Sequence, residues 1–299
     1  MPGENLTRIE AQERRAVVDT HEYEVTLDLT RGAEIFGSRT VVRFTGTEGA
    51  DTFIDLIARD IREITLNGRS IDPATAFADS RIALTGLERD NELVIDADCL
   101  YTNTGEGLHR FVDPVDGEVY LYSQFEVPDS RRMYAVFEQP DLKATFRFTV
   151  TAPDAWAVVS NSPTPEPKRH GDGTATWSFE ATPRISSYIT ALIAGPYEST
   201  FSELTSASGR VIPLGIYGRK SLWQHLDTEY VFEKTRQGFA YYEDKFDFPY
   251  PFAKYDQLFV PEFNAGAMEN AGAVTFTETY VFRSKVTDAV KERRVVTIL

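Results

Sequence analysis

The chain contains 299 residues, of which 42% are hydrophobic and 12% aromatic. It is therefore long and apolar enough for a globular protein with about two domains, and it is not a disordered chain. Lys and Arg together number 31 against 46 Asp and Glu, which gives a net charge of −15. This acidic balance argues against nucleic acid or an anionic membrane as the main partner.

The cysteine content and the first residues bear on the compartment. Cys99 is the single cysteine, so no internal disulfide can form and a reducing compartment is favoured. Residues 1–6 contain neither a basic nor an apolar stretch, so the sequence predicts no signal peptide. No apolar run reaches the roughly 20 residues of a membrane span. We expect a soluble protein of the cytoplasm.

The first two thirds of the chain carry mainly strand patterns. The polar, charged segment 5–19 suits a short surface helix. At 23–29 apolar and polar residues then alternate, which is the period-two pattern of a half-buried strand. Similar patterns recur at 34–44, 52–57, 61–66, 81–84, 92–96, 146–150, 174–180 and 188–194.

These strand patterns predict one sheet-rich domain. Asn67-Gly68, directly after an apolar run, is typical of a hairpin turn between antiparallel strands. We expect a domain built on antiparallel sheet, either a sandwich or a curved, saddle-like sheet. Gly195-Pro196 is its predicted boundary.

The segment 119–126 is a further strand pattern, and it carries polar side chains. Its alternation places Gln124 and Glu126 on the same face as the two tyrosines that precede them. The residues after this strand suggest a helical turn capped by Asp129.

The last third of the chain has a different pattern. A strand at 211–217 leads to a long helix that we expect to start near Ser221, because Ser221 and Gln224 have the spacing of a capping box. A second helix is predicted from about Thr287, and its apolar stripe continues through Leu299. Because helices usually end at a glycine, a proline or a polar turn, we expect the chain to be truncated there.

A run of small residues at 261–274 lies between two strand patterns. It opens with Pro261, contains two glycines, and places Glu269 beside an amide in an otherwise apolar stretch. Small residues allow backbone N–H groups to approach a ligand closely, and Glu269 supplies one negative charge. A tight turn at a strand edge would explain the same residues without any ligand.

The pentapeptide at 266–270 resembles the exopeptidase motif of the aminopeptidase N family of zinc metallopeptidases. Three further segments resemble segments of that family, in the same order and at similar spacing. They are Gln124-Phe125-Glu126, Asp129-Ser130-Arg131-Arg132 and the run from Phe137 to Phe146. Residues 5–8 are similar to the opening of the actinobacterial-type branch, so the resemblance covers essentially the whole chain.

The resemblance implies a fold with two parts. These are an N-terminal β-saddle domain at 1–195 and the first portion of an α+β, thermolysin-like catalytic domain at 196–299. In the family, the helix after the motif carries His-Glu-x-x-His, whose histidines bind zinc and whose glutamate activates water. This sequence contains no His-Glu-x-x-His, and the helix ending at Leu299 resembles the segment that leads into it. We expect zinc in the intact protein, but no metal ligand and no catalytic residue within this chain.

The resemblance also implies a site for the free N-terminus of a peptide. Glu126 and Glu269 would bracket the ammonium group, and Gln124 would add a carbonyl acceptor. The backbone of the motif would pair with the peptide as an added strand. The substrate-binding residues implied in this way are Gln124, Glu126, Gly266, Ala267, Met268, Glu269 and Asn270.

The histidines offer an alternative metal site. His21, His109, His170 and His225 are scattered through the chain. His225 and Glu229 are four residues apart, a spacing that can bind a metal on a helix but is far more often a solvated pair. We expect no cofactor to bind this chain specifically.

The leading hypothesis is a zinc-dependent aminopeptidase that removes N-terminal amino acids from peptides. This chain would supply the clamp for the substrate N-terminus but not the zinc site, and by itself it is expected to be inactive. The alternative is a non-catalytic peptide- or protein-binding scaffold derived from the same family. A third hypothesis is a related epoxide hydrolase, but Ala267 inside the motif fits the aminopeptidases better. The sequence carries no signal for the oligomeric state or for the preferred N-terminal residue.

Overall fold

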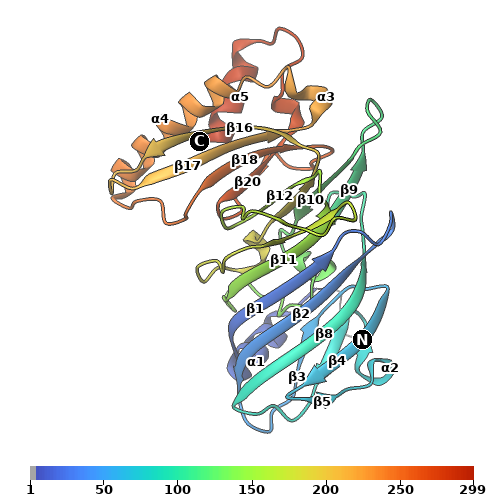
Figure 1. The fold of residues 1–299 in the computed structure, drawn as a ribbon. Coiled ribbons are helices and arrows are strands. Elements are labelled where there is room, and N and C mark those ends of the chain that lie inside the picture. Colours follow the sequence, from blue (N-terminus) through green and yellow to red (C-terminus); the bar gives the residue numbers. More distant parts are fainter. Residues whose placement is uncertain (1–4) are drawn as a thin grey trace.

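The structure, a computed structural model, describes residues 5–299 and consists of two stacked parts (Figure 1). The N-terminal part extends through β15, which ends at Gly195, and the C-terminal part starts with β16 at Glu198. A mainly β part followed by a part with long helices over a sheet confirms the predicted fold class. The domain boundary at 195–196 stays a prediction.

The largest sheet of the N-terminal part has eight strands in the order β13-β14-β11-β1-β2-β8-β4-β5. Their bounds are β1 (Val18–Asp28), β2 (Ile35–Gly46), β4 (Asp60–Leu66), β5 (Arg69–Ser70), β8 (Asp90–Leu100), β11 (Thr145–Pro153), β13 (Lys168–Arg169) and β14 (Thr174–Ser178). All neighbours pair antiparallel except β1 and β11, which run parallel. The sheet is thus mixed, because the chain passes through a second sheet before it returns beside β1.

Two smaller sheets complete the N-terminal part, in the orders β12-β15-β10-β9 and β3-β7-β6. Their bounds are β3 (Thr52–Asp55), β6 (Phe77–Ala78), β7 (Arg81–Leu84), β9 (Gly107–Val112), β10 (Val119–Gln124), β12 (Ala157–Ser160) and β15 (Leu192–Gly195), with the short helix α2 (Pro73–Ala76) before β6. The hairpin predicted at Asn67-Gly68 is confirmed. Both residues have positive φ, 53° and 76°, and they join β4 to β5, as a type I′ turn requires.

β10 contributes to two hydrophobic cores, one on each face. Leu121, and Phe125 directly after the strand, pack into the core of the N-terminal part. Tyr120 and Tyr122 point the other way and pack in a second core that includes Met268 of the C-terminal part. The two tyrosines therefore share a face, as predicted, and that face is the junction between the two parts.

The C-terminal part has a five-stranded sheet in the order β16-β17-β18-β20-β19, and long helices cover one of its faces (Figure 1). The bounds are β16 (Glu198–Thr205), β17 (Val211–Gly218), β18 (Tyr255–Val260), β19 (Ala267–Met268), β20 (Ala273–Thr277), α4 (Thr228–Phe246) and α5 (Asp288–Ile298), with the 3-10 turn η3 (Glu278–Tyr280) after β20. α5 begins directly after Thr287, as predicted. Among residues 5–299, no helix is both long and apolar enough to span a membrane.

The single long helix expected from Ser221 is wrong, because the chain forms two helices there. α3 (Lys220–Trp223) is short, and α4 begins only at Thr228. Ser221 lies inside α3, and its hydroxyl donates to the buried carboxylate of Asp113 at 2.5 Å. Its side chain binds the N-terminal part and does not cap a helix.

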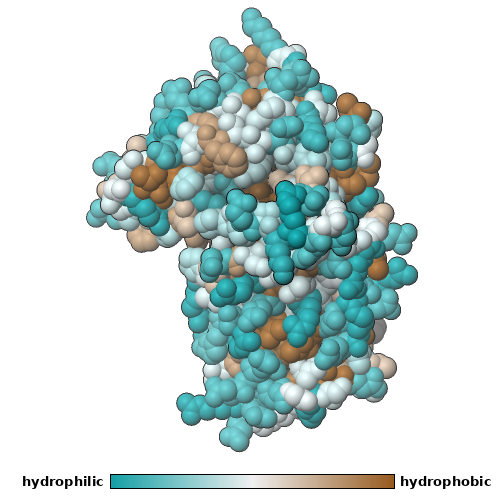
Figure 2. All heavy atoms as spheres, in the orientation of Figure 1, coloured by the Kyte–Doolittle hydropathy of each residue, from teal (hydrophilic) through white to brown (hydrophobic). Residues whose placement is uncertain are grey.

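The surface of the molecule is mostly polar on the face shown in Figure 2. Brown, apolar atoms gather at the left tip of the C-terminal part, over the end of α4. Phe246 and Phe248, at and just beyond that end, are 70% and 62% exposed.

The predicted surface helix is α1 (Arg8–Val17), and it contains one buried charge. Arg14 is 2% exposed. Its guanidinium donates to Oδ2 of Asp55 at 2.6 Å, to Oε1 of Gln139 at 3.2 Å and to the carbonyl of Glu138 at 3.1 Å. The helix is therefore fastened to the sheet by an ion pair, which the polar character of 5–19 did not reveal.

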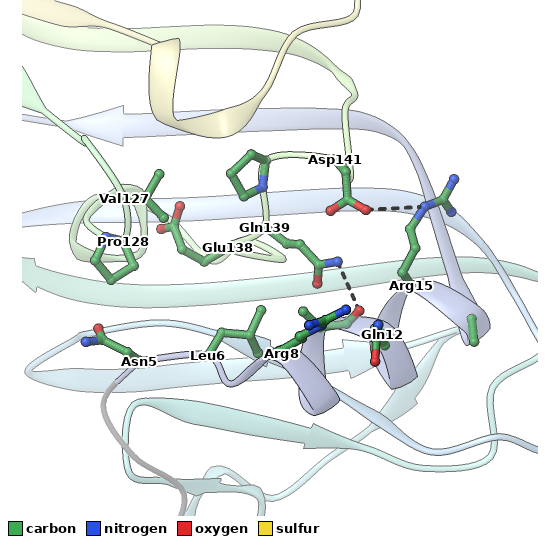
Figure 3. A pocket seen from close by; sticks show the side chains of 13 residues that line it. Asn5, Leu6, Arg8, Gln12, Arg15, Val127, Pro128, Glu138, Gln139 and Asp141 are labelled. Carbon is green, nitrogen blue, oxygen red and sulfur yellow. Dashed lines mark hydrogen bonds and ion pairs between the residues drawn. The ribbon is translucent and has the colours of Figure 1, made fainter.

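A pocket of about 740 Å³ lies between α1 and the segment 127–141 (Figure 3). Gln139 crosses it to donate to a backbone carbonyl of α1, and Arg15 pairs with Asp141 at 3.8 Å on its outer side. These contacts attach the helix along its length, with the buried Arg14 beneath.

The 3-10 turn η1 (Ser130–Arg132) follows β10 in this segment. Asp129 precedes it, as predicted, but the Asp129 side chain makes no capping hydrogen bond. It accepts instead from Nε of Arg132 at 2.5 Å. The residue that holds η1 in place is Glu138.

Glu138 anchors η1 from the protein interior. Its carboxylate accepts from Oγ of Ser130 at 2.5 and 2.6 Å, from the backbone N–H of Arg131 at 2.8 Å and from Oγ of Ser187 at 3.2 Å. Burial raises the pKa of Glu138 to about 7, although the Ser130 and Arg131 hydrogen bonds oppose the shift. The carboxyl therefore holds its proton more tightly in the folded protein than in the unfolded chain.

Replacing Arg14 by Met should destabilise the fold strongly, because the change leaves the Asp55 carboxylate buried without its main partner. We expect a loss of about 3–5 kcal/mol in the free energy of unfolding, measured by urea denaturation. Arg15→Met is the matched control, since Arg15 makes only exposed pairs and should cost at most about 1 kcal/mol. Equal losses for the two variants would contradict the anchoring role of Arg14.

Glu138→Gln should change how stability depends on pH. Below pH 4.5 the carboxyl is protonated in both states. Between 4.5 and about 7 only the unfolded chain releases the proton, so wild-type stability falls as pH rises. The variant cannot titrate there, and its stability relative to wild type should rise across this window by up to about 3 kcal/mol. Urea denaturation from pH 4.5 to 8 measures this, and parallel profiles would refute the raised pKa.

Candidate peptide-binding site

The motif loop at 261–272 connects β18 to β20 and contains the short strand β19. Ala267 pairs with Phe276 and Met268 with Thr275, both antiparallel. At Gly272, where φ is 71°, a β-carbon would lie 2.6 Å from the carbonyl oxygen of Asn161. This approach to the N-terminal part requires glycine.

β19 is the last strand of its sheet. On one side it pairs with β20, and no strand among the described residues pairs with its outer edge. Unpaired N–H and C=O groups on such an edge can take an extended peptide as an additional strand. This arrangement is compatible with the backbone role that the resemblance implies for 266–268.

The side chains of the motif have different surroundings. Met268 is 2% exposed and packs in the core at the junction of the two parts. Asn270 is 1% exposed and donates to Oγ1 of Thr275 at 3.4 Å, while its carbonyl accepts from the N–H of Ala273 at 3.1 Å. Glu269 between them is exposed. Glu269 is thus the motif side chain that offers a charge to solvent.

Gln124 and Glu126 lie at the end of β10 in different settings. Gln124 is the last residue of the strand and is 9% exposed, and its Oε1 has no hydrogen-bond partner among residues 5–299. Glu126 is exposed in the turn that follows. The expectation that the strand alternation extends to Glu126 is wrong, because the chain leaves the sheet after Gln124.

Hydrogen bonds fasten the motif loop to the N-terminal part at both ends. Near its start, the hydroxyl of Tyr122 donates to the carbonyl of Glu262 at 3.3 Å. Near its end, Nδ2 of Asn161 donates to the carbonyls of Ala271 and Ile189 at 2.8 and 2.9 Å. Burial raises the pKa of Tyr122 well above its usual range, so its hydroxyl keeps its proton and remains a donor. The loop is therefore held against β10, the strand that carries Gln124.

A second set of contacts between the two parts involves residues that the sequence analysis missed. Arg219 donates to both carboxylate oxygens of Glu278 at 2.6 Å and to Oδ2 of Asp113 at 2.6 Å. Its guanidinium also stacks over the ring of Phe111 at 4.9 Å. Burial alone would raise the pKa of Asp113, but hydrogen bonds from Ser221 and Arg219 hold it below its usual range. No local pattern marks these residues, since their partners are distant in sequence.

A pocket of about 440 Å³ adjoins the motif. Its walls include Ala267, Glu269 and Asn270 from the loop, and Thr297 and Ile298 from α5. One carboxylate beside a largely apolar wall suits a cation attached to an apolar group.

The family resemblance implies a metal, and a metal needs a group of ligating side chains. Within residues 5–299, no group of three or more His, Cys, Asp and Glu side chains could hold a metal ion. His225 lies between α3 and α4 and Glu229 lies in α4, so the two do not share one helix face. The described residues therefore do not fit zinc.

Two family models match the chain. The peptidase M1 N-terminal domain matches residues 20–189, and the peptidase family M1 domain matches residues 230–299. The first model alone covers more than half of the sequence.

Several curated proteins are similar to this chain. It is 61% identical over 303 residues to the aminopeptidase N of Streptomyces lividans, in an alignment that covers 100% of this chain and 35% of the relative. It is 36% identical over 159 residues to the aminopeptidase N of Acetobacter pasteurianus, covering 53% of this chain and 43% of the relative. It is 32% identical over 186 residues to the aminopeptidase Ey of Gallus gallus, covering 61% and 19%.

The whole of this chain aligns with the Streptomyces relative, but it spans only about a third of the length of that relative. The family models follow one another along the chain in the order of its two structural parts. These matches confirm the resemblance drawn from the motifs, and the chain belongs to the peptidase M1 family.

Proposed function

We propose that this chain forms the end of a peptide-binding cleft that holds the free N-terminus of a substrate, within a zinc-dependent aminopeptidase. Membership of the peptidase M1 family and the 61% identity to a protein named aminopeptidase N support the reaction class. The relatives are longer than this chain, so the zinc chemistry is proposed for a protein that also contains a metal site. The clamp for the substrate N-terminus is proposed for residues of this chain.

The observation that carries the proposal is the unpaired carbonyl of Gln124. A buried carbonyl oxygen without a partner is rare and costs free energy, yet Oε1 of Gln124 is buried with no hydrogen-bond partner among the described residues. It lies on the strand against which the motif loop is fastened. The ammonium group of a substrate would supply the N–H donor that Oε1 of Gln124 lacks.

Two exposed carboxylates complete the proposed clamp. Glu126 follows Gln124 in the turn after β10, and Glu269 follows β19 in the motif loop. Hydrogen bonds from an ammonium to these groups would each contribute about 1.5–3 kcal/mol when shielded from water. An internal segment of a peptide brings no cation and would leave the carboxylates unpaired, which favours cleavage after the first residue only.

The open edge of β19 would align the substrate. Backbone groups of Gly266, Ala267 and Met268 would pair with the first residues of the peptide. This pairing does not depend on side-chain identity, so the clamp fixes which bond is presented while the adjacent pocket accommodates the side chain. The buried single cysteine, Cys99, fits the cytoplasm as the proposed compartment.

The clamp predicts that binding depends on a free amino group. The 299-residue chain should bind Leu-Gly-Gly more tightly than N-acetyl-Leu-Gly-Gly in an NMR titration. Glu269→Gln and Gln124→Ala should each raise the Kd for Leu-Gly-Gly about 10- to 150-fold. The variants should leave the weaker binding of the acetylated peptide almost unchanged.

Glu180→Gln is the matched control, because Glu180 is 90% exposed and forms only a long pair with Arg147. It should leave both affinities unchanged. Equal binding of the free and acetylated peptides would favour the alternative function, a non-catalytic scaffold, and would refute the clamp.

The chain alone should not turn over substrate. With zinc present, we expect no hydrolysis of leucine p-nitroanilide, because no described group of side chains can hold the metal. Release of nitroaniline that requires zinc and disappears with Glu269→Ala would show this expectation to be wrong.

A further inference from the structure

His109 is a buried histidine of β9 at the junction of the two parts. Its exposure is 0%. Its ring stacks on Tyr122 of β10, with centroids 4.8 Å apart and planes inclined by 25°. Its Nδ1 accepts from the backbone N–H of Gly105 at 3.0 Å, and its Nε2 lies 3.2 Å from Oε2 of Glu262. The proposed clamp does not use His109 directly.

The contacts of His109 define its protonation state. A ring nitrogen that accepts a hydrogen bond carries no proton, so the proton of the neutral ring is on Nε2. This N–H faces the Glu262 carboxylate at ion-pair distance but outside hydrogen-bond geometry, since Nε2 has no hydrogen-bond partner among residues 5–299. Burial lowers the pKa of His109, and Glu262 opposes the shift only in part. The ring is therefore neutral at neutral pH.

Glu262 has a backbone conformation that needs support. Its φ is 53°, in the left-handed region that residues other than glycine rarely adopt. Its carbonyl accepts from the Tyr122 hydroxyl, and the next residue, Phe263, packs edge-on against the Tyr122 ring at 5.6 Å. His109 and Tyr122 together thus surround the turn that opens the motif loop.

The same turn is held from a second side. Nδ2 of Asn264 donates to the carbonyl of Thr104 at 2.6 Å. At Gly105, where φ is 80°, a β-carbon would lie 2.1 Å from Nδ2 of Asn264. The segment 104–109 therefore contacts the turn at two points, through Asn264 and through the His109–Glu262 contact.

Both sides of the proposed clamp extend from this contact. Tyr122 lies two residues before Gln124 on the same strand, and the turn with Glu262 leads directly into the motif. We propose that His109 is a positioning residue, which fixes the motif loop relative to β10 through Glu262 and Tyr122 and so sets the geometry of the N-terminus clamp. The proposal deepens the proposed function and rests on it.

The neutral ring is the form that positions the loop. The titratable groups that face His109 are the Glu262 carboxylate, from the motif loop, and the Tyr122 phenol, from β10. Protonation would place a proton on Nδ1, where it meets the N–H of Gly105 and removes that hydrogen bond. Because the pKa in the fold is lowered from 6.5, the contribution of His109 is complete above pH 6.5 and is lost as pH falls through the lowered value.

Two substitutions separate the two ring nitrogens. His109→Asn keeps an acceptor near the position of Nδ1 and removes Nε2, whereas His109→Gln keeps a donor near Nε2 and removes Nδ1. If the contact with Glu262 positions the loop, His109→Asn should raise the Kd for Leu-Gly-Gly about tenfold, and His109→Gln should stay within about twofold of wild type. The exposed His170 provides the control, His170→Asn, which should change nothing.

Glu262→Gln should resemble His109→Asn, because it removes the charge that the Nε2–H faces. The double variant should lose less affinity than the product of the two single losses, since both remove the same contact. Independent, multiplying losses would show that the two residues act separately and would overturn the proposal.

A measurement without ligand tests positioning directly. In the isotopically labelled chain, His109→Asn should shift the amide resonances of 265–270, and long-range nitrogen spectra of wild type should show the Nε2–H form at pH 7.5. An Nδ1–H form, or lowered stability in urea with unchanged resonances and unchanged Kd, would reduce His109 to a structural role. If wild type fails to bind Leu-Gly-Gly, the proposed function is wrong, while the 265–270 resonances still decide the positioning role.

Discussion

The molecule depends on one strand that belongs to two cores. β10 turns Leu121 into the core of the N-terminal part and Tyr120 and Tyr122 into the core at the junction. Each buried aromatic side chain contributes on the order of 2–3 kcal/mol through removal from water. The same strand thus supports the fold of the first part and the docking of the second. Gln124 is the last residue of this strand.

Buried charges fix the orientation of the pieces that β10 joins. Arg14 pairs with Asp55 beneath α1, and Arg219 joins Asp113 to Glu278 across the junction. Pairs of this kind contribute little net stability, because both ions lose their hydration. Their directed hydrogen bonds instead exclude other arrangements of the same apolar surfaces. Orientation, more than strength, is what a site shared by two parts requires.

Local sequence patterns predicted the elements well, but not the contacts between them. Periodicity located most strands, the turn predicted at Asn67-Gly68 joins β4 to β5, and α5 begins close to the start predicted at about Thr287. The capping-box spacing at Ser221 predicted the wrong helix start, because the Ser221 side chain binds Asp113, which lies 108 positions away in the sequence. His109 and Glu262 have no local signal for the same reason. The candidate site residues came from the family resemblance, since neither charge nor spacing alone distinguishes Glu269 from an ordinary turn residue.

The shortness of β19 has a consequence for self-association. Long, flat edge strands recruit other copies of the same chain, because each pairing adds several hydrogen bonds. β19 is two residues long and is followed by an exposed carboxylate. A second copy that paired with β19 would form too few backbone hydrogen bonds for stable association. It would also bring a net charge of −15 toward Glu269. This edge of the sheet therefore offers little to a second copy of the chain.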